Sequence, residues 1–176
     1  MHEIQLKNYE ITGILGTGAD YEVRSAVALD TGETVVLKRP IPQVITRDMH
    51  APIEARTESI IETYRDLFES TNTLCPLIGY TSKCNHNELY NDGIMQDYTV
   101  LVFERAPGIP LVGDARSRIL RIPIGIPQNL FTLYPLFQLD DSSCWSVQAQ
   151  LLETEQQFFE SGRILLDLGP QNVYYQ

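Results

Sequence analysis

Alternating apolar and polar positions at the start of the chain predict three consecutive β-strands. The strands are expected at residues 9–15, 21–29 and 34–38. In the second of them Val23, Val27 and Leu29 are separated by polar or small residues. This two-residue period is typical of a strand with one buried face. The turn Asp30-Thr31-Gly32-Glu33 then predicts an antiparallel hairpin between the second and third strands.

A period of three to four residues follows and predicts an amphipathic helix over residues 52–69. Its apolar face would consist of Ile60, Ile61, Tyr64, Leu67 and Phe68. The charged residues are expected on the remaining, solvated surface, and they are Glu54, Arg56, Glu58, Glu62, Arg65, Asp66 and Glu69.

Two short apolar runs, residues 74–80 and 98–103, flank the polar stretch 81–97 and predict a further hairpin with a long loop. The first part of the chain would therefore contain five strands and one helix. The composition changes at Arg105, and five of the ten prolines fall between residues 107 and 135, which excludes one long helix there.

A helical pattern resumes between Val147 and Phe159, with an expected N-cap at Ser142 or Ser143 and an expected end at Gly162. We therefore divide the chain into a first part, residues 1–104, and a second part, residues 105–176.

Charge and composition narrow the classes of function. The 176 residues carry a net charge of −10, which repels phosphate backbones and anionic lipids, so we expect no nucleic-acid partner. The longest apolar run, residues 99–103, is far shorter than the ~20 residues of a membrane span. The N-terminal residues lack the pattern of a signal peptide, and three widely spaced cysteines make no disulfide framework. A cytoplasmic protein is expected.

Metal binding is not expected from the sequence. Cys84 and His86 are the two possible metal ligands that lie close together, and no second pair completes the four ligands that zinc normally takes.

Gly16 and Gly18 lie in the turn between the first two strands. Glycines in such a turn let the backbone approach a phosphate and leave its N–H groups free to bind it, although a plain tight turn would contain them equally well. A dinucleotide-binding Rossmann motif is excluded because a strand, and not a helix, follows the glycines.

The order of motifs resembles that of the protein kinases. Val35-Val36-Leu37-Lys38 follows the glycine turn at the distance of the kinase Val-Ala-Ile-Lys motif, and Phe103-Glu104-Arg105-Ala106 stands where the hinge between the two kinase lobes belongs. Residues 165–172, Leu-Leu-Asp-Leu-Gly-Pro-Gln-Asn, resemble the kinase catalytic loop His-Arg-Asp-Leu-Lys-Pro-Glu-Asn. Residues 164–169 also resemble the Asp-Phe-Gly segment, but Pro170 and Asn172 favour the catalytic loop.

The resemblance implies an α+β fold. The N-lobe would be a five-stranded antiparallel sheet with one helix, and it would be followed by an incomplete, mainly helical C-lobe.

The resemblance also implies ATP and Mg²⁺ as ligands, with a role for each matching residue. Gly16 and Gly18 would cover the phosphates, and Lys38 would contact the α- and β-phosphates. The remaining adenine-binding positions would be Val23, Val36 and the backbone of Glu104 and Ala106. Asp167 would be the catalytic base and Asn172 the metal ligand. Glu58 is the favoured partner of Lys38, and Glu62 is the alternative.

Several positions depart from the kinase pattern. Tyr21 stands at the third glycine, Val36 replaces alanine, Leu165 and Leu166 replace His-Arg, and Gly169 replaces lysine. The sequence also stops four residues after Asn172, without an Asp-Phe-Gly motif. We therefore expect the chain as given to be inactive as a protein kinase. We also expect the apolar face of helix 147–159 to be covered by a protein partner or by a missing C-lobe.

Three functions remain open at this point. The first is a Ser/Thr-kinase-like ATP-binding domain that is catalytically incomplete, and the second is a non-catalytic interaction module, a pseudokinase scaffold. The third is a small-molecule kinase similar to the aminoglycoside phosphotransferases, which share the Asp-x4-Asn loop.

Overall fold

The computed structural model describes residues 1–42, 50–67, 71–82, 90, 94, 97–110, 140–165 and 172–175. The chain forms two compact units, residues 1–105 and residues 106–176. Each unit is described by itself below. The boundary that we placed from the sequence lies between residues 104 and 105.

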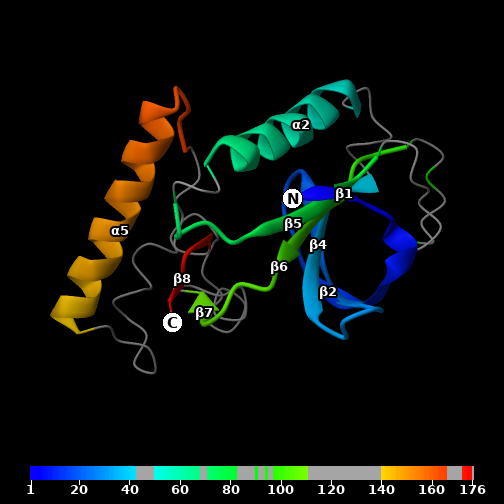
Figure 1. Ribbon diagram of the computed structural model, residues 1–176, viewed down its shortest axis with the longest axis horizontal. Helices are drawn as coiled ribbons and strands as arrows, with labels where there is room; N and C mark the ends of the chain where they lie inside the picture. Colours follow the sequence, from blue (N-terminus) through cyan, green and yellow to red (C-terminus); the bar gives the residue numbers. More distant parts are fainter. Residues whose placement is uncertain are drawn as a thin grey trace. The chain divides into compact units, whose positions relative to one another are not determined.

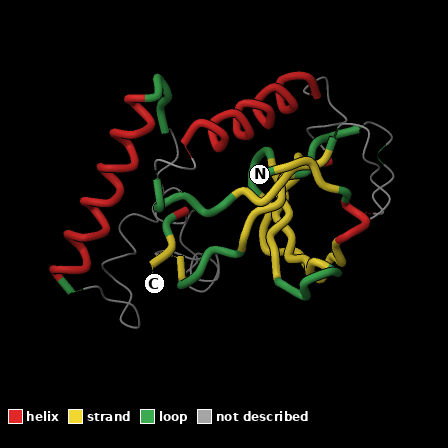
Figure 2. The backbone as a smooth tube through the Cα atoms, in the orientation of Figure 1, coloured by secondary structure: helices red, strands yellow, loops and turns green. Residues whose placement is uncertain are grey.

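The first unit contains a mixed six-stranded sheet with the strand order β1-β5-β6-β4-β3-β2 (Figures 1 and 2). The strands are β1 (His2–Ile4), β2 (Tyr9–Thr17), β3 (Tyr21–Ala28), β4 (Thr34–Pro40), β5 (Leu77–Thr81) and β6 (Leu101–Glu104). A short 3-10 helix, η1 (Leu6–Asn8), joins β1 to β2. Every neighbouring pair is antiparallel except β1 and β5, which are parallel. The predicted α+β class is confirmed.

The strand count differs from the five that the sequence predicted, because β1 adds a sixth strand at the edge. Three residues are too few to show an alternating pattern. Gly79 of β5 is what lets β1 approach, since a Cβ atom there would lie 2.6 Å from the carbonyl oxygen of His2 and 2.7 Å from Cγ2 of Ile4. The edge strand therefore depends on a glycine 77 positions further along the chain.

The predicted hairpin between the second and third sequence segments is confirmed as β3 and β4. Its turn is closed by a hydrogen bond from the N–H of Gly32 to the carbonyl oxygen of Ala28, at 2.8 Å. Gly32 has a φ of 73°, a left-handed conformation that glycine adopts at no steric cost.

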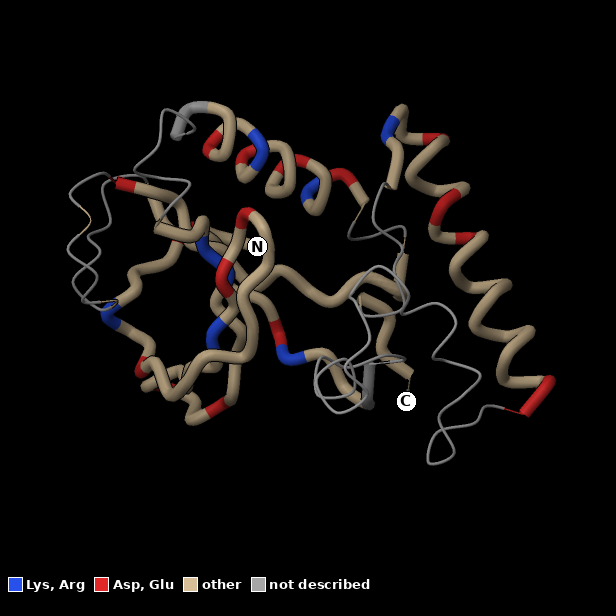
Figure 3. Tube along the Cα trace, turned by 180° about the vertical axis from the view of Figure 1, so that it is seen from behind, with Lys and Arg blue, Asp and Glu red and all other residues tan. Residues whose placement is uncertain are grey.

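Helix α2 (His50–Leu67) covers one face of this sheet (Figure 1). Ile61 packs with Leu77 and Leu101, and the rings of Tyr64 and Phe103 meet edge to face with their centroids 5.5 Å apart. Acidic and basic residues are interspersed along the helix, with the acidic ones in the majority (Figure 3). The predicted helix is confirmed up to Leu67, and its last two predicted residues lie outside the described part of the chain.

The opposite face of the sheet is also covered by apolar residues. They are Ile4, Leu6, Ala26, Val35, Leu37, Tyr90, Ile94, Tyr98, Val100 and Val102. Two of these residues, Tyr90 and Ile94, come from the stretch 81–97, which was expected to be a long polar loop, and Tyr98 begins the predicted apolar run 98–103. The central strands of the sheet are thus covered on both faces, whereas most of the edge strand β2 is exposed.

The second unit contains helix α5 (Asp141–Glu160) and a pair of short antiparallel strands, β7 (Ile109–Pro110) and β8 (Tyr174–Tyr175). Asp140 is the N-cap of α5, because its side chain accepts a hydrogen bond from the N–H of Ser143 at 2.7 Å. The predicted cap at Ser142 or Ser143 is therefore wrong by two or three residues. Gly162 ends the helix as predicted, with a φ of 75°. Of the helices in the described ranges, none is long and apolar enough to cross a membrane.

Candidate functional site

Lys38 lies on the face of the sheet that α2 covers. Its neighbours across the sheet are Val23 of β3 and Leu101 of β6. Residues paired across antiparallel strands point to the same face, and Leu101 packs against Ile61 of α2. The side chain of Lys38 is therefore directed into the layer between sheet and helix, where it is half-buried.

The ring of Tyr21 lies between Lys38 and α2. The Nζ atom of Lys38 is 4.7 Å from the centroid of this ring, within range of a cation–π interaction. The hydroxyl of Tyr21 is 2.9 Å from Oγ1 of Thr57, which is fully buried on α2. Thr57 uses its own proton to bond the carbonyl oxygen of Ile53, so Tyr21 is the donor to Thr57. Burial raises the pKa of Tyr21, which therefore keeps the proton that it donates.

The glycine turn between β2 and β3 is a tight hairpin. The N–H of Gly18 donates to the carbonyl oxygen of Tyr21 at 2.8 Å. This N–H is therefore engaged within the turn, whereas the sequence analysis expected it to be free for a phosphate. Beside Gly16, which pairs with Val23, the space is open: no atom lies within 4 Å of the position that a Cβ would take.

The tip of the same turn is held to α2 by an ion pair. Asp20 pairs with Arg56 at the surface, and the carbonyl oxygen of Asp20 accepts the N–H of Ile41 at 2.9 Å. Together with the bond between Tyr21 and Thr57, this contact fixes the turn against the helix.

The glutamate of α2 that faces the sheet is Glu54. It is 4% exposed, and its two carboxylate oxygens accept the N–H of Thr99 at 3.2 Å and the hydroxyl of Thr99 at 3.1 Å. The sequence analysis placed Glu54 on the solvated surface and is corrected here. Glu54 stands seven residues before Ile61, two turns along the same helix face, and this spacing could have revealed it. The two glutamates proposed as partners of Lys38, Glu58 and Glu62, are exposed.

The proposed adenine-binding positions are described in part. Val36 is half-buried and pairs with Phe103, which places it on the same face as Lys38. The backbone of Glu104 is already bonded, because its N–H donates to Pro76 at 2.9 Å and its carbonyl oxygen accepts the thiol of Cys75 at 3.1 Å. Ala106 is the first residue of the second unit.

The proposed catalytic loop is barely described. Asp167 lies outside the described residues, and Asn172 is an exposed residue of the second unit shortly before β8. Cys84 and His86 also lie outside the described residues. Within the ranges that the structure covers, no group of three His, Cys, Asp or Glu side chains is arranged to hold a metal ion.

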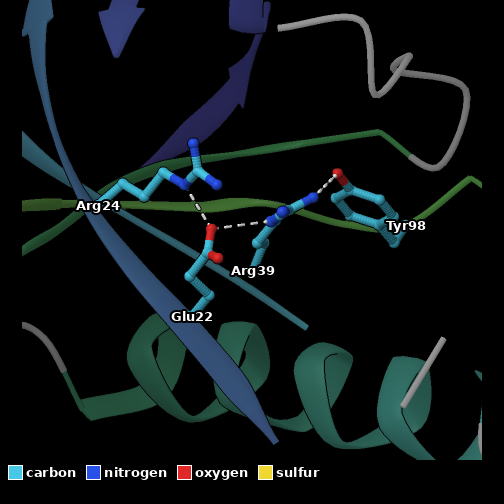
Figure 4. A network of polar contacts seen from close by, with 4 residues as sticks. All are labelled: Glu22, Arg24, Arg39 and Tyr98. Carbon is cyan, nitrogen blue, oxygen red and sulfur yellow. Dashed lines mark hydrogen bonds and ion pairs between the residues drawn. The ribbon is translucent and has the colours of Figure 1, made fainter. Parts of the chain in front are cut away.

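A buried polar network occupies the opposite face of the sheet (Figure 4). Arg39, only 1% exposed, donates from Nε to Oε1 of Glu22 at 3.2 Å and from Nη1 to the hydroxyl oxygen of Tyr98 at 2.6 Å. Arg24 forms an ion pair with the same Glu22 oxygen. The guanidinium of Arg39 also stacks on the ring of Tyr90, 3.8 Å from its centroid. The network thus joins β3, β4 and the segment that covers this face.

The positive charges of Arg24 and Arg39 favour the ionised form of the Glu22 carboxylate. Burial raises the pKa of Glu22, but the hydrogen bonds and positive charges of Arg24 and Arg39 outweigh it, so the pKa lies below its ordinary value. Because each charge has a bonded partner, we interpret the network as structural. The sequence did not reveal this network, because the predicted strand ended at Lys38 and the partner Tyr98 lies 59 residues away from Arg39.

The described site therefore consists of the ammonium group of Lys38 beside the ring of Tyr21. Val23 and Val36 lie on the same face, and the space beside Gly16 is open.

Neither a family model nor a curated protein matches this chain.

Proposed function

We propose that the first unit is a protein-kinase-like nucleotide-binding domain that takes ATP with Mg²⁺ on the α2 face of its sheet. The observation that carries the proposal is the position of Lys38. It lies on β4, on the face of the sheet that α2 covers. Its cross-strand neighbour Val23 pairs in turn with Gly16 of the glycine turn. A strand lysine between a glycine loop and a helix is the arrangement with which kinases bind the α- and β-phosphates.

The neighbouring residues fit such a ligand. Val23 and Val36 lie on the same face as Lys38 and would provide apolar contacts for the adenine ring. The open space beside Gly16 would admit a phosphate. The ammonium group of Lys38 would offset the negative charge of the phosphates. The proposal concerns nucleotide binding by the first unit, and the roles of Asp167 and Asn172 stay expectations from the sequence.

Tyr21 competes with the nucleotide for Lys38. Its ring contacts Nζ and fills the layer between Lys38 and Thr57. A phosphate that binds Lys38 would compete with this cation–π contact. A cation–π contact at a partly exposed site is worth about 0.5–2 kcal/mol, which corresponds to a change of roughly tenfold in affinity. Glycine, the kinase residue at this position, would remove the competition.

The test is an equilibrium titration of the protein with Mg·ATP, followed by thermal stabilisation. We expect stabilisation of the wild type, its loss in Lys38→Met, and no loss in Lys7→Met, which removes an exposed lysine of the same unit. Tyr21→Gly should bind about tenfold more tightly. Tyr21→Phe keeps the ring but lacks the bond to Thr57, so it should lie between Tyr21→Gly and the wild type.

The proposal would be overturned by equal binding of wild type and Lys38→Met, or by the absence of stabilisation in every variant at millimolar ATP.

A second candidate, a non-catalytic docking protein, is favoured by a separate observation. Helix α5 exposes large apolar side chains, which are typical of a surface that docks a partner protein.

A further inference from the structure

Helix α5 exposes an apolar stripe along its whole length. The stripe consists of Trp145, Leu152 and Phe159, which are 70%, 65% and 77% exposed. These residues are spaced seven apart, two helical turns, so their side chains follow one side of the helix. We refer to these three residues as the α5 stripe.

A different side of α5 is buried. Thr154 is 4% exposed and Phe158 is 7% exposed, and Tyr175 of β8 donates a hydrogen bond to Ser143 at 3.1 Å. The helix is therefore already anchored, and the α5 stripe is an additional apolar surface. Large exposed apolar side chains that line up on one side of a helix are typical of an interaction surface.

The charges beside the stripe all have one sign. Within residues 141–160 the acidic residues are Asp141, Glu153, Glu155 and Glu160, all of them exposed, and the same residues include no lysine or arginine (Figure 3). Glu153 and Glu160 each follow a stripe residue by one position and lie about 100° to one side of it. Glu155 follows Leu152 by three positions and lies about 60° to the other side. The α5 stripe is thus bordered by carboxylates on both sides.

We propose that the α5 stripe docks a basic amphipathic helix of a partner protein. Leucine or aromatic residues of that helix would pack on Trp145, Leu152 and Phe159, and lysine or arginine residues on its flanks would pair with the bordering glutamates. A second copy of this chain does not fit, because two α5 helices would bring eight carboxylates and no cation together, within a protein whose net charge is already −10.

The size of the stripe indicates a reversible contact. From Trp145 to Phe159 it is about 21 Å long, which matches a partner helix of roughly 15–20 residues. Its three side chains offer about 400 Å² of apolar area, well below the area of an obligate interface. We therefore expect micromolar affinity with a strong dependence on salt concentration.

Trp145 reports on this surface directly, because it is the sole tryptophan of the chain. The probe is a designed helical peptide of about 20 residues with a leucine stripe flanked by lysines, and its matched control carries glutamates in place of the lysines. With the full-length chain, the basic peptide should shift tryptophan emission to shorter wavelength in a saturable titration. The acidic peptide should bind at least tenfold more weakly.

Two variants test whether the α5 stripe and its bordering glutamates bind the peptide, and a third variant is a control. Leu152→Gln combined with Phe159→Gln keeps the reporter and should weaken binding at least tenfold. Glu153→Gln, Glu155→Gln and Glu160→Gln together should abolish the preference for the basic peptide. Leu29→Gln, at an exposed leucine of the first unit, should change nothing.

Equal binding of the two peptides would overturn the proposal, as would unchanged binding by the Leu152 and Phe159 variant. A blue shift of the chain alone with rising protein concentration would also overturn it in favour of self-association. Lys38→Met should bind the peptide like the wild type, so this test is independent of nucleotide binding.

Discussion

Arg39 of β4 donates a hydrogen bond to the hydroxyl of Tyr98, 59 residues further along the chain, at 2.6 Å. The bond ties the centre of the sheet to the segment that covers it. It also places a charged donor on a phenol that is 1% exposed. Because the same guanidinium holds Glu22, Arg39 is the residue on which the buried network depends most.

Replacing Arg39 should therefore destabilise the first unit strongly. Arg39→Met leaves Glu22 with one cation fewer and Tyr98 without its donor, at a cost of about 3 kcal/mol in the free energy of unfolding. Urea unfolding followed by circular dichroism measures this cost. Arg24→Met is the control and should cost less, because the Arg24 side chain is 20% exposed whereas that of Arg39 is 1% exposed. Equal costs for the two variants would contradict the assignment.

Removing the hydroxyl group should change the stability of the protein differently at two tyrosines of the network. Tyr98→Phe removes a hydrogen bond to a charged donor and should cost about 2 kcal/mol. The hydroxyl of Tyr90 is buried and has no hydrogen-bond partner among the described residues, while its ring stacks on Arg39. Tyr90→Phe should therefore be neutral or slightly stabilising. Thermal unfolding of the two variants side by side decides this, and a Tyr90→Phe variant as unstable as Tyr98→Phe would refute the prediction.

Stability should depend on pH through Glu22. Its pKa is lower in the folded protein than the ordinary value of 4.5, so its contribution is fully present above about pH 4.5 and is lost as the pH falls through the lower folded value. The wild type should therefore be more stable than Glu22→Gln at neutral pH, and this difference should shrink in acid. Denaturant unfolding of both proteins across this pH range measures the difference, and a gap that stays constant would argue against an ionised Glu22.

The edge strand β1 should detach when Gly79 is given a side chain. A Cβ there would lie 2.6 Å from the carbonyl oxygen of His2, so Gly79→Ala must displace β1 or distort β5, at about 1–3 kcal/mol. Hydrogen exchange should show lost protection at residues 2–4. Gly13→Ala is the matched control, because no atom lies within 4 Å of the Cβ position at Gly13. Unchanged protection in Gly79→Ala would show that β1 does not depend on this approach.

The elements that the sequence predicted correctly are those whose signal is local. The helix over residues 50–67 follows from the spacing of Ile60, Ile61 and Tyr64, and the β3–β4 hairpin follows from alternation and from Gly32. Both patterns repeat over several residues, so one unusual position does not hide them. A local signal was not sufficient at the start of α5. Aspartate and serine are equally good N-caps, so the sequence could not distinguish Asp140 from Ser142 or Ser143.

The features that were missed depend on partners far away in the sequence. The pairing of β1 requires a glycine in β5, and the burial of Glu54 requires Thr99 as a donor. The charged residues of the helix were assigned to the surface by default, which is the correct average behaviour but is wrong for Glu54. Of the candidate site, the sequence identified Lys38 and the glycine turn. It identified Tyr21 only as a departure from the glycine pattern, and not as the ring that contacts Lys38.

The adjacent positions of Lys38 and Arg39 in β4 limit which insertions and deletions the strand can tolerate. Strand residues point alternately to opposite faces, so a shift of β4 by one residue would exchange the two cations between the buried network and the α2 face. An insertion or deletion of one residue within β4, ahead of Lys38, would therefore disturb both layers together, whereas the turn after β3 can absorb such a change without shifting the strand. Length variation among related chains should therefore be confined to the turn.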